Sequence, residues 1–292
     1  MAVRSVLSRS AGSVCGLRMA ISTVLPTGET TDTNIINASQ DAPSRTDGSG
    51  TTGGGGFTVA SWNIRCGRNG GLESSCRALK SLNVDIAFLQ EAKLTQRIYA
   101  RRSFGYSIVA SEASSPSLGG VALVWREGGN YEVEETKIWG PNVLAFRLVT
   151  NDADYYVVGC YIPPSDLATM EQGKAAWAQC PTGFIPLLLG DLNIDLDAPR
   201  CEREEIIAEQ CDAWDFTDMP AQFKQRRRRR VAGRWTWRQH RKGRWLSSQP
   251  DYFLCPLKHR KRFKKVVLRL PRHHISDHRI IMAHFKGGGQ NG

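Results

Sequence analysis

The sequence predicts an α/β protein built as a sandwich of β-strands with helices packed against them. Strand-like segments occur along most of residues 57–286, and segments with helical spacing separate some of them. The first such unit is a strand at 57–62, a helix in which apolar residues recur between Leu72 and Leu82, and a strand at 84–89. Strand, helix and strand in this order are typical of an α/β unit.

Further strand-like segments fill the middle of the chain, near residues 106–110, 119–125, 142–149 and 154–161. We expect these four to form one layer of the sandwich. Helical segments at Asp166–Gln179 and Cys201–Trp214 then flank an apolar strand that begins at Ile185, which gives a second α/β half.

Length and composition favour one large domain. The chain has 292 residues, of which 41% are apolar, which is enough for a sizeable core. No apolar run approaches the roughly 20 residues that span a bilayer, so we expect no membrane partner. The eight cysteines lack Cys-x-x-Cys and Cys/His ligand spacing, which predicts reduced thiols and no zinc. We expect a monomer.

The two ends of the chain differ in composition from the predicted domain. Residues 1–56 are rich in Ser, Thr and Gly and end in four glycines, so we expect a flexible or disordered leader and linker. The domain is predicted at 57–286 and a flexible tail at 287–292. The first 25 residues hold three arginines and no acid, a composition compatible with a mitochondrial or plastid transit peptide. If these residues do not act as a transit peptide, we expect the protein in the nucleus.

The net charge of +11 is concentrated in one segment. Between Met219 and Ser276 there are nineteen Lys and Arg residues and a single acid, Asp251. Five consecutive arginines cannot be packed in a core, so we expect an exposed Arg-rich loop at 224–244. Such a charge block is either a solvated tail or a surface that binds polyanions, and tryptophans within it favour nucleic acid.

One short segment combines a buried strand with polar residues that can do chemistry. Ile185–Gly190 is apolar, and Asp191 and Asn193 follow where the strand meets solvent. Because side chains alternate in an extended chain, we expect both to point to the same side, with Gly190 leaving room for a substrate. The alternative is an ordinary Asx turn after a strand.

Five other motifs decide between these two interpretations by their order along the chain. They are Ser61-Trp62-Asn63-Ile64, Leu89-Gln90-Glu91, Tyr161-Ile162-Pro163-Pro164, Asp251-Tyr252-Phe253-Leu254 and Ser276-Asp277-His278. With these motifs, the chain resembles the endonuclease/exonuclease/phosphatase superfamily from about Phe57 to Phe285. It is most similar to the endonuclease domains that non-LTR retrotransposons share with magnesium-dependent apurinic-site nucleases.

The resemblance implies two packed mixed β-sheets flanked by helices, and a site that hydrolyses phosphodiesters. Hard oxygen ligands suit Mg²⁺ or Mn²⁺, and the expected ligands are Glu91, Asn63 and Asp277, with Glu91 as the main one. Asp191 is expected to orient and deprotonate the attacking water. The other residues expected to bind phosphate or support catalysis are Asn193, Tyr161, His278 and Asp251, the last as the partner that fixes the His278 tautomer.

Two residues depart from the family pattern. Arg65 stands where repair nucleases commonly carry an acid, which puts a second metal position in doubt. Pro250 stands before Asp251 where an aliphatic residue is usual, so the local strand lacks one backbone donor.

Several basic and aromatic residues are expected to contact DNA. The Thr236-Trp237 segment resembles the part of retroelement endonucleases that contacts DNA beside the scissile bond. A second basic cluster at Lys258–Lys265 could equally be a nuclear localisation signal. The expected contact residues are Arg226, Arg227, Arg228, Arg229, Arg230, Trp237, Arg238 and Ser248.

These observations predict a Mg²⁺-dependent DNA endonuclease that nicks one strand, of retroelement or abasic-site type. Two alternatives stay open. One is another phosphoester hydrolase of the same superfamily, acting on RNA, a phospholipid or an inositol phosphate. The other is a non-catalytic copy that only binds nucleic acid, although the intact site residues weigh against it.

Overall fold

Strand β1 (Thr58–Asn63) lies near the middle of the first of two large sheets. The computed structural model describes residues 55–164, 166–223, 235–271 and 276–287. β1 pairs in parallel with β2 (Ile86–Gln90) and antiparallel with β15 (Ile280–Phe285). The sheet is completed on one side by β5 (Val121–Trp125), β4 (Tyr106–Ala110) and β3 (Ile98–Ser103), and at the other edge by β14 (Phe263–Arg269).

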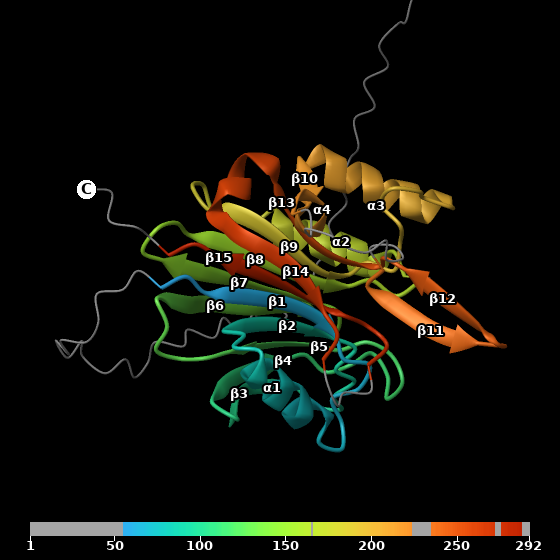
Figure 1. Cartoon of the computed structure of the whole chain (residues 1–292), viewed down its shortest axis with the longest axis horizontal. Helices are drawn as coiled ribbons and strands as arrows, with labels where there is room; N and C mark the ends of the chain where they lie inside the picture. The colour runs from blue at the N-terminus through green and yellow to red at the C-terminus, as the bar shows by residue number, and fades with distance from the viewer. Residues whose placement is uncertain (1–54, 165, 224–234, 272–275, 288–292) are drawn as a thin grey trace, which may run out of the picture. The chain divides into compact units, whose positions relative to one another are not determined.

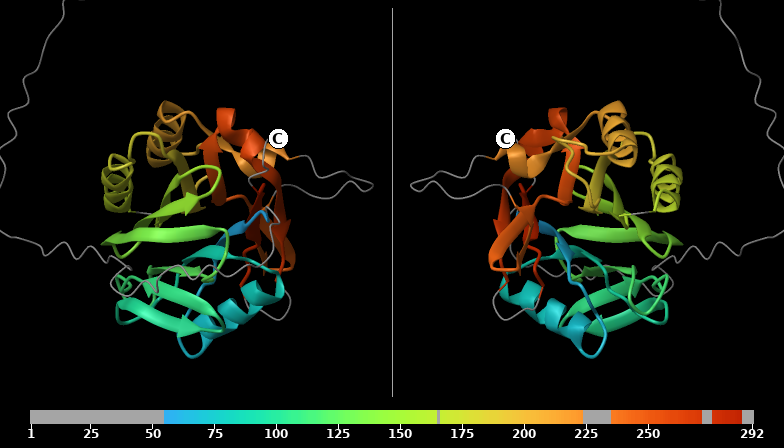
Figure 2. Two further views of the ribbon diagram at one scale, coloured as in Figure 1. Left: turned by 90° about the vertical axis from the view of Figure 1, so that its left-hand side faces the viewer. Right: turned by 90° about the vertical axis from the view of Figure 1, so that its right-hand side faces the viewer.

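The second sheet is built around β9 (Ile185–Asp191), the apolar strand that the sequence singled out. β9 pairs in parallel with β8 (Tyr155–Tyr161) and antiparallel with β13 (Asp251–Pro256). Its other strands are β7 (Val143–Thr150), β6 (Tyr131–Gly140) and β10 (Phe216–Asp218). The two mixed sheets pack face to face with helices outside them, which confirms the predicted fold class (Figure 2).

The prediction that four central strands share one layer is wrong. β4 and β5 belong to the seven-stranded sheet, whereas β7 and β8 belong to the six-stranded sheet. The chain changes sheets between β5 and β6. An apolar pattern reports which side of a strand is buried but not which sheet the strand joins, so the crossing left no signal in the sequence.

The core between the sheets is apolar and tightly packed. Phe88 from β2 and Phe146 from β7 are fully buried in it. Gly159 on β8 faces Phe88, and a Cβ there would lie 2.3 Å from two carbon atoms of that ring. The Phe88 ring therefore occupies the space that a side chain at position 159 would fill.

Helices cover the outer faces of both sheets (Figure 2). Helix α1 (Gly71–Ser81) buries Leu72, Cys76 and Leu79 on the seven-stranded sheet, as its apolar spacing predicted. The six-stranded sheet is covered by α2 (Ala168–Trp177) and α3 (Glu202–Ala213), which confirms both predicted helices. Two short helical turns are α4 (Met219–Gln222) and the 3₁₀ segment η1 (Leu257–Arg262).

A β-hairpin extends beyond the two sheets (Figure 1). It consists of β11 (Trp237–Arg241) and β12 (Arg244–Ser248). The sequence predicted an exposed loop at 224–244, and the described part of that range holds β11 and the turn of this hairpin instead. Residues 224–234 lie outside the described part of the chain, as do almost all of the predicted leader and tail.

None of the helices in the described residues is both long and apolar enough to span a membrane. The seven cysteines within the described ranges are all free thiols.

Candidate active site

Four strand ends meet at one end of the sandwich and carry the polar side chains of the site. The parallel pairs β1/β2 and β8/β9 both finish there, at Asn63, Gln90, Tyr161 and Asp191. The antiparallel strand β13 begins there, because Asp251 lies opposite Asp191 in the register. The carboxyl ends of parallel strands in each sheet therefore build one common site.

Asn63 connects two carboxylates at the centre of the site. Its side-chain nitrogen donates to Glu91 Oε1 and to Asp191 Oδ2, both at 2.8 Å. Its side-chain oxygen accepts from the backbone N–H of Arg65 at 2.9 Å. In this geometry Asn63 orients two carboxylates through its nitrogen, whereas the sequence predicted its oxygen as a metal ligand.

Glu91 follows β2 in a left-handed backbone conformation and contacts a lysine that sequence analysis missed. Lys93 Nζ lies 2.6 Å from Glu91 Oε2. Burial alone would raise the pKa of Glu91, but the hydrogen bond from Asn63 and the Lys93 ammonium outweigh it and lower that pKa. Glu91 is thus held as a carboxylate. No periodic pattern marks Lys93, because it lies in the irregular segment that follows β2.

Asp191 and Asn193 both line the cleft, as predicted, but for a different reason. Asn193 has φ 51°, and its backbone N–H donates to Asp191 Oδ1, so the pair forms a turn rather than an extended strand. Asn193 Nδ2 donates to the carbonyl of Ile162. A Cβ on Gly190 would lie 1.8 Å from the Cys160 carbonyl oxygen, so this glycine makes room for the neighbouring strand, not for a substrate.

His278 lines the cleft and forms a buried pair with Asp251, which lies behind it, as the sequence predicted. His278 Nδ1 lies 2.9 Å from Asp251 Oδ2. Burial disfavours the charged imidazole, but the charge and hydrogen bond of Asp251, with lesser contributions from Asp191 and Asp277, raise the pKa of His278 to about 9. The imidazolium therefore keeps its Nδ1 proton on Asp251, and Nε2 carries the other.

Burial and neighbouring charges also shift the pKa values of Asp191 and Tyr161. Burial and the nearby Asp251 carboxylate raise the pKa of Asp191 to about 7, against the opposing effect of His278. Burial and the charges of Glu91 and Asp191 raise the pKa of Tyr161, so its hydroxyl stays neutral and can donate a hydrogen bond.

Asp277 lies at the base of the hairpin. Trp237 Nε1 donates to Asp277 Oδ2 at 3.0 Å, and Arg65 Nε lies 3.6 Å from Asp277 Oδ1. Arg65 thus brings a positive charge to the position where repair nucleases commonly carry an acid. Arg238 stacks over the rings of Trp245 and Trp235, with its Cζ 4.3 Å and 5.5 Å from their centroids.

The donor set of the site fits a hard divalent cation. Asp251 Oδ1 and Asp277 Oδ1 are buried and accept no hydrogen bond from the described residues. Ligand atoms of Asp191, Asp251 and His278 lie within 4.8 Å of one another, but a His278 ring that carries both protons offers a metal ion no lone pair, so the carboxylates are the donors. Carboxylate oxygens of this kind suit Mg²⁺ or Mn²⁺.

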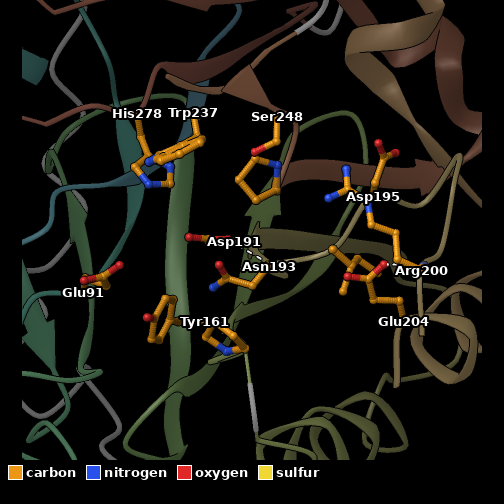
Figure 3. A pocket seen from close by; sticks show the side chains of 13 residues that line it. Glu91, Tyr161, Asp191, Asn193, Asp195, Arg200, Glu204, Trp237, Ser248 and His278 are labelled. Atoms are coloured by element: carbon orange, nitrogen blue, oxygen red, sulfur yellow. Dashed lines mark hydrogen bonds between the residues drawn. The ribbon is translucent and has the colours of Figure 1, made fainter. Parts of the chain in front are cut away.

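The residues surround a cleft of about 380 Å³ (Figure 3). Asp191 and Asn193 lie at its centre in this view, between Tyr161 and the His278–Trp237 side, with Glu91 at one end. Ser248 also lines the cleft. Asn63 and Asp251 are buried behind it. At the other end are three lining residues that sequence analysis missed, Asp195, Arg200 and Glu204.

Arg203 is a further residue that sequence analysis missed. Its guanidinium donates to four backbone carbonyls: those of Ile162 and Pro163 after β8, at 3.4 and 2.9 Å, and those of Leu192 and Asn193 after β9, at 3.4 and 3.5 Å. It therefore ties together the two segments that carry Tyr161 and Asn193. Backbone acceptors have no sequence signature, so no pattern could have identified this contact.

The structure thus brings Asn63, Glu91, Tyr161, Asp191, Asn193, Asp251, Asp277 and His278 together at one end of the sandwich, with Trp237, Arg238 and Ser248 on the hairpin beside them. The predicted contacts at Arg226 to Arg230 lie outside the described residues.

Comparisons with known proteins agree with this architecture. One structural match is the endonuclease domain of TRAS1, a telomere-specific non-LTR retrotransposon, with 16% identity, a TM-score of 0.56, and 78% of this chain and 98% of that chain covered. A second is an AP endonuclease from Archaeoglobus fulgidus, with 19% identity, a TM-score of 0.57 and coverage of 78% and 99%. A third is a variant of the 3′ phosphatase NExo from Neisseria bound to a product DNA hairpin, with 20% identity, a TM-score of 0.59 and coverage of 79% and 99%.

At these identities the structural matches establish the fold. No match was found among curated proteins. Residues 60–278, well over half of the chain, match the family model that describes the endonuclease/exonuclease/phosphatase family. The chain therefore belongs to the endonuclease/exonuclease/phosphatase family.

Proposed function

We propose that this protein is a divalent-metal-dependent DNA endonuclease that nicks one strand and leaves a 3′-hydroxyl. The observation that carries the proposal is the convergence of Asp191, Glu91 and the His278–Asp251 pair on one cleft, beside a hairpin whose cation Arg238 stacks on exposed Trp245. A cleft rich in carboxylates suits phosphoester hydrolysis, and a cationic aromatic hairpin suits nucleic acid.

The residues divide the chemistry between them. Asp191, with its pKa near neutrality, orients a water molecule and takes its proton as the water oxygen attacks phosphorus. The bond from phosphorus to the 3′-oxygen breaks, the attacking oxygen stays on the 5′-phosphate, and the 3′-oxygen takes up a proton from solvent water to become the 3′-hydroxyl. The charged His278, the Asn193 amide and the neutral Tyr161 hydroxyl hold the phosphate oxygens as negative charge develops.

A divalent cation held by Glu91, with Asp277 as a second ligand, would neutralise phosphate charge. The Lys93 ammonium already bound to Glu91 would have to move or share that carboxylate when the cation binds. Asn63 keeps Glu91 and Asp191 aligned from behind the cleft.

Supercoiled-plasmid nicking, with Mg²⁺ or with EDTA, tests the proposal. We expect nicking only with Mg²⁺. Asp191→Asn should lower the rate by about 10² or more while DNA affinity is retained, because the amide keeps the shape but cannot take a proton. Asp212→Asn makes the same chemical change on an exposed part of α3 and should leave the rate unchanged.

Two results would contradict the proposal. Hydrolysis of an inositol phosphate or a phospholipid without plasmid nicking would assign the cleft to the alternative substrates of the superfamily. DNA binding that persists without turnover under any divalent cation would assign the chain to the non-catalytic class.

A further inference from the structure

The edge of the seven-stranded sheet carries a second basic surface, separate from the cleft. It consists of η1 and the edge strand β14, and we call it the β14 ridge. Its exposed cations are Lys258, Arg260, Lys261, Lys264, Lys265 and Arg269. This is the cluster that the sequence left open between a localisation signal and a nucleic-acid contact.

The structure argues against a linear signal at this position. Phe263, in the middle of the cluster, is 3% exposed and packs against the rings of Phe253 and Phe285. β14 pairs with β15 over its whole length. A receptor that reads an extended peptide could bind this segment only after the edge of the sheet had unfolded.

The field of the ridge is positive, with one acid in hydrogen-bonding contact with its described cations. That acid is Asp152, which pairs with Arg262. Burial, followed by the charges of Lys258, Arg262 and Lys261, lowers the pKa of His259. Burial, followed by the charges of Lys265, Arg269 and Lys264, lowers the pKa of His284.

The ridge starts at the end of the sheet where the cleft lies. Arg269 pairs with Ile280 in the register, and Ile280 is two residues after His278 of the cleft. From there β14 leads away for seven residues, roughly 23 Å at the usual rise of a strand. That length corresponds to about six or seven base-pair steps of duplex DNA.

We propose that the β14 ridge binds the phosphate backbone of double-stranded DNA that continues beyond the cleft. This inference rests on the proposed function. The ridge offers point charges and, among its described residues, no exposed aromatic ring on which an unpaired base could stack, which favours a duplex over a single strand. Its contacts are to phosphates and therefore add affinity without sequence preference.

The test is the salt dependence of duplex binding in EDTA, where no cleavage occurs. The ridge variant combines Lys264→Gln, Lys265→Gln and Arg269→Gln, three exposed cations that make no ion pair in the described structure. The control variant combines Arg97→Gln, Arg101→Gln and Arg102→Gln, which remove equal charge at or near the opposite sheet edge, β3.

On a duplex of about 30 base pairs, we expect the ridge variant to lower the slope of log K against log salt by up to about 2.7, since each lost phosphate contact accounts for about 0.9. The control variant should keep the original slope. Plasmid nicking at saturating enzyme should be unchanged in both.

The outcomes separate this inference from the proposed function. An unaltered slope in the ridge variant, with normal nicking, would overturn the ridge alone. Absence of duplex binding by the unsubstituted chain would overturn both. Exposed Leu257 and Leu270 lie at the two ends of the ridge, so vesicles of anionic phospholipid are the competing partner. Vesicle binding that only the ridge variant loses, with its duplex slope unaltered, would replace DNA by a membrane surface.

Discussion

At the scale of single residues, the His278–Asp251 pair makes the most direct prediction about catalysis. Asp251→Asn keeps the size of the side chain but favours the wrong imidazole tautomer and removes a charge that holds the proton on His278. We expect nicking to fall by about 10² to 10⁴, the upper end being the effect of the analogous change in the protease triad. The pKa of His278, followed by NMR titration, should also fall.

A double-mutant comparison checks whether the two residues act as one unit. His278→Ala and Asp251→Asn together should cost no more than the larger single defect, because groups that act jointly fail jointly. If the losses multiply in full, the two side chains act independently and the pairing has no catalytic role.

Arg203 makes a prediction about positioning. Arg203→Gln removes the charged fork that joins the carbonyls after β8 and β9. The side chains of Tyr161 and Asn193 should then lose their precise placement, which can cost up to about 10² in kcat. KM should change little, since Arg203 contacts backbone carbonyls of the chain.

Arg203→Lys distinguishes positioning from a general effect on folding. The lysine ammonium can replace some of the guanidinium's hydrogen-bond donors but not its planar geometry. We therefore expect a kcat for Arg203→Lys between those of the unsubstituted chain and Arg203→Gln. The exposed Arg97→Gln serves as control. If Arg203→Gln lowers stability and leaves kcat of the folded fraction intact, the guanidinium contributes to the fold alone.

At the scale of elements, β14 affects the titration of its neighbour β15. Burial, followed by the charges of Lys265, Arg269 and Lys264, lowers the pKa of His284 from 6.5 to about 4. Because the unfolded chain binds this proton more readily, the contribution of His284 to stability is complete above about pH 6.5 and is lost as the pH falls through 4. Lys265→Gln with Arg269→Gln should raise this pKa but leave it below 6.5.

NMR titration of the His284 ring in the double variant checks the cause. Denaturant unfolding at pH 7 and pH 4.5 should show a smaller acid-induced loss than in the unsubstituted chain. An unchanged pKa would mean that burial alone determines the titration of His284, and that the cations of β14 lie in water that screens them.

Elements also show what the sequence could and could not predict. The strands β1, β2, β8 and β9 and the helix α1 have strong apolar patterns, because each is covered by the core. β3 has an exposed Arg101-Arg102 pair on an edge, and β6 contains irregular registers, so neither has a regular apolar alternation. Among the site residues, side chains in short motifs could be found, whereas Arg203 binds backbone carbonyls and Lys93 lies in an irregular segment after β2 that no periodicity describes.

At the scale of the whole molecule, the site depends on how closely the two sheets approach, because its residues come from both. Gly159 on one sheet lies against the ring of Phe88 on the other within the core. Gly159→Ala would place a Cβ 2.3 Å from the Phe88 ring, so the sheets must separate or the ring must move. We expect the free energy of unfolding to fall by about 1–3 kcal/mol, the usual cost of overpacking.

The nicking rate of Gly159→Ala should fall together with its stability, since Asn63 on one sheet hydrogen-bonds Asp191 on the other. The matched control is Gly173→Ala in α2, whose new Cβ would meet only Cys160 Sγ at 3.4 Å; it should be neutral or stabilise the helix by up to about 1 kcal/mol. Phe88→Leu makes room for the new methyl group. In the Gly159→Ala background, Phe88→Leu should therefore cost less stability than it does alone, and restore part of the nicking rate. Equal costs in both backgrounds, measured by denaturant unfolding, would show that this contact does not set the distance between the sheets.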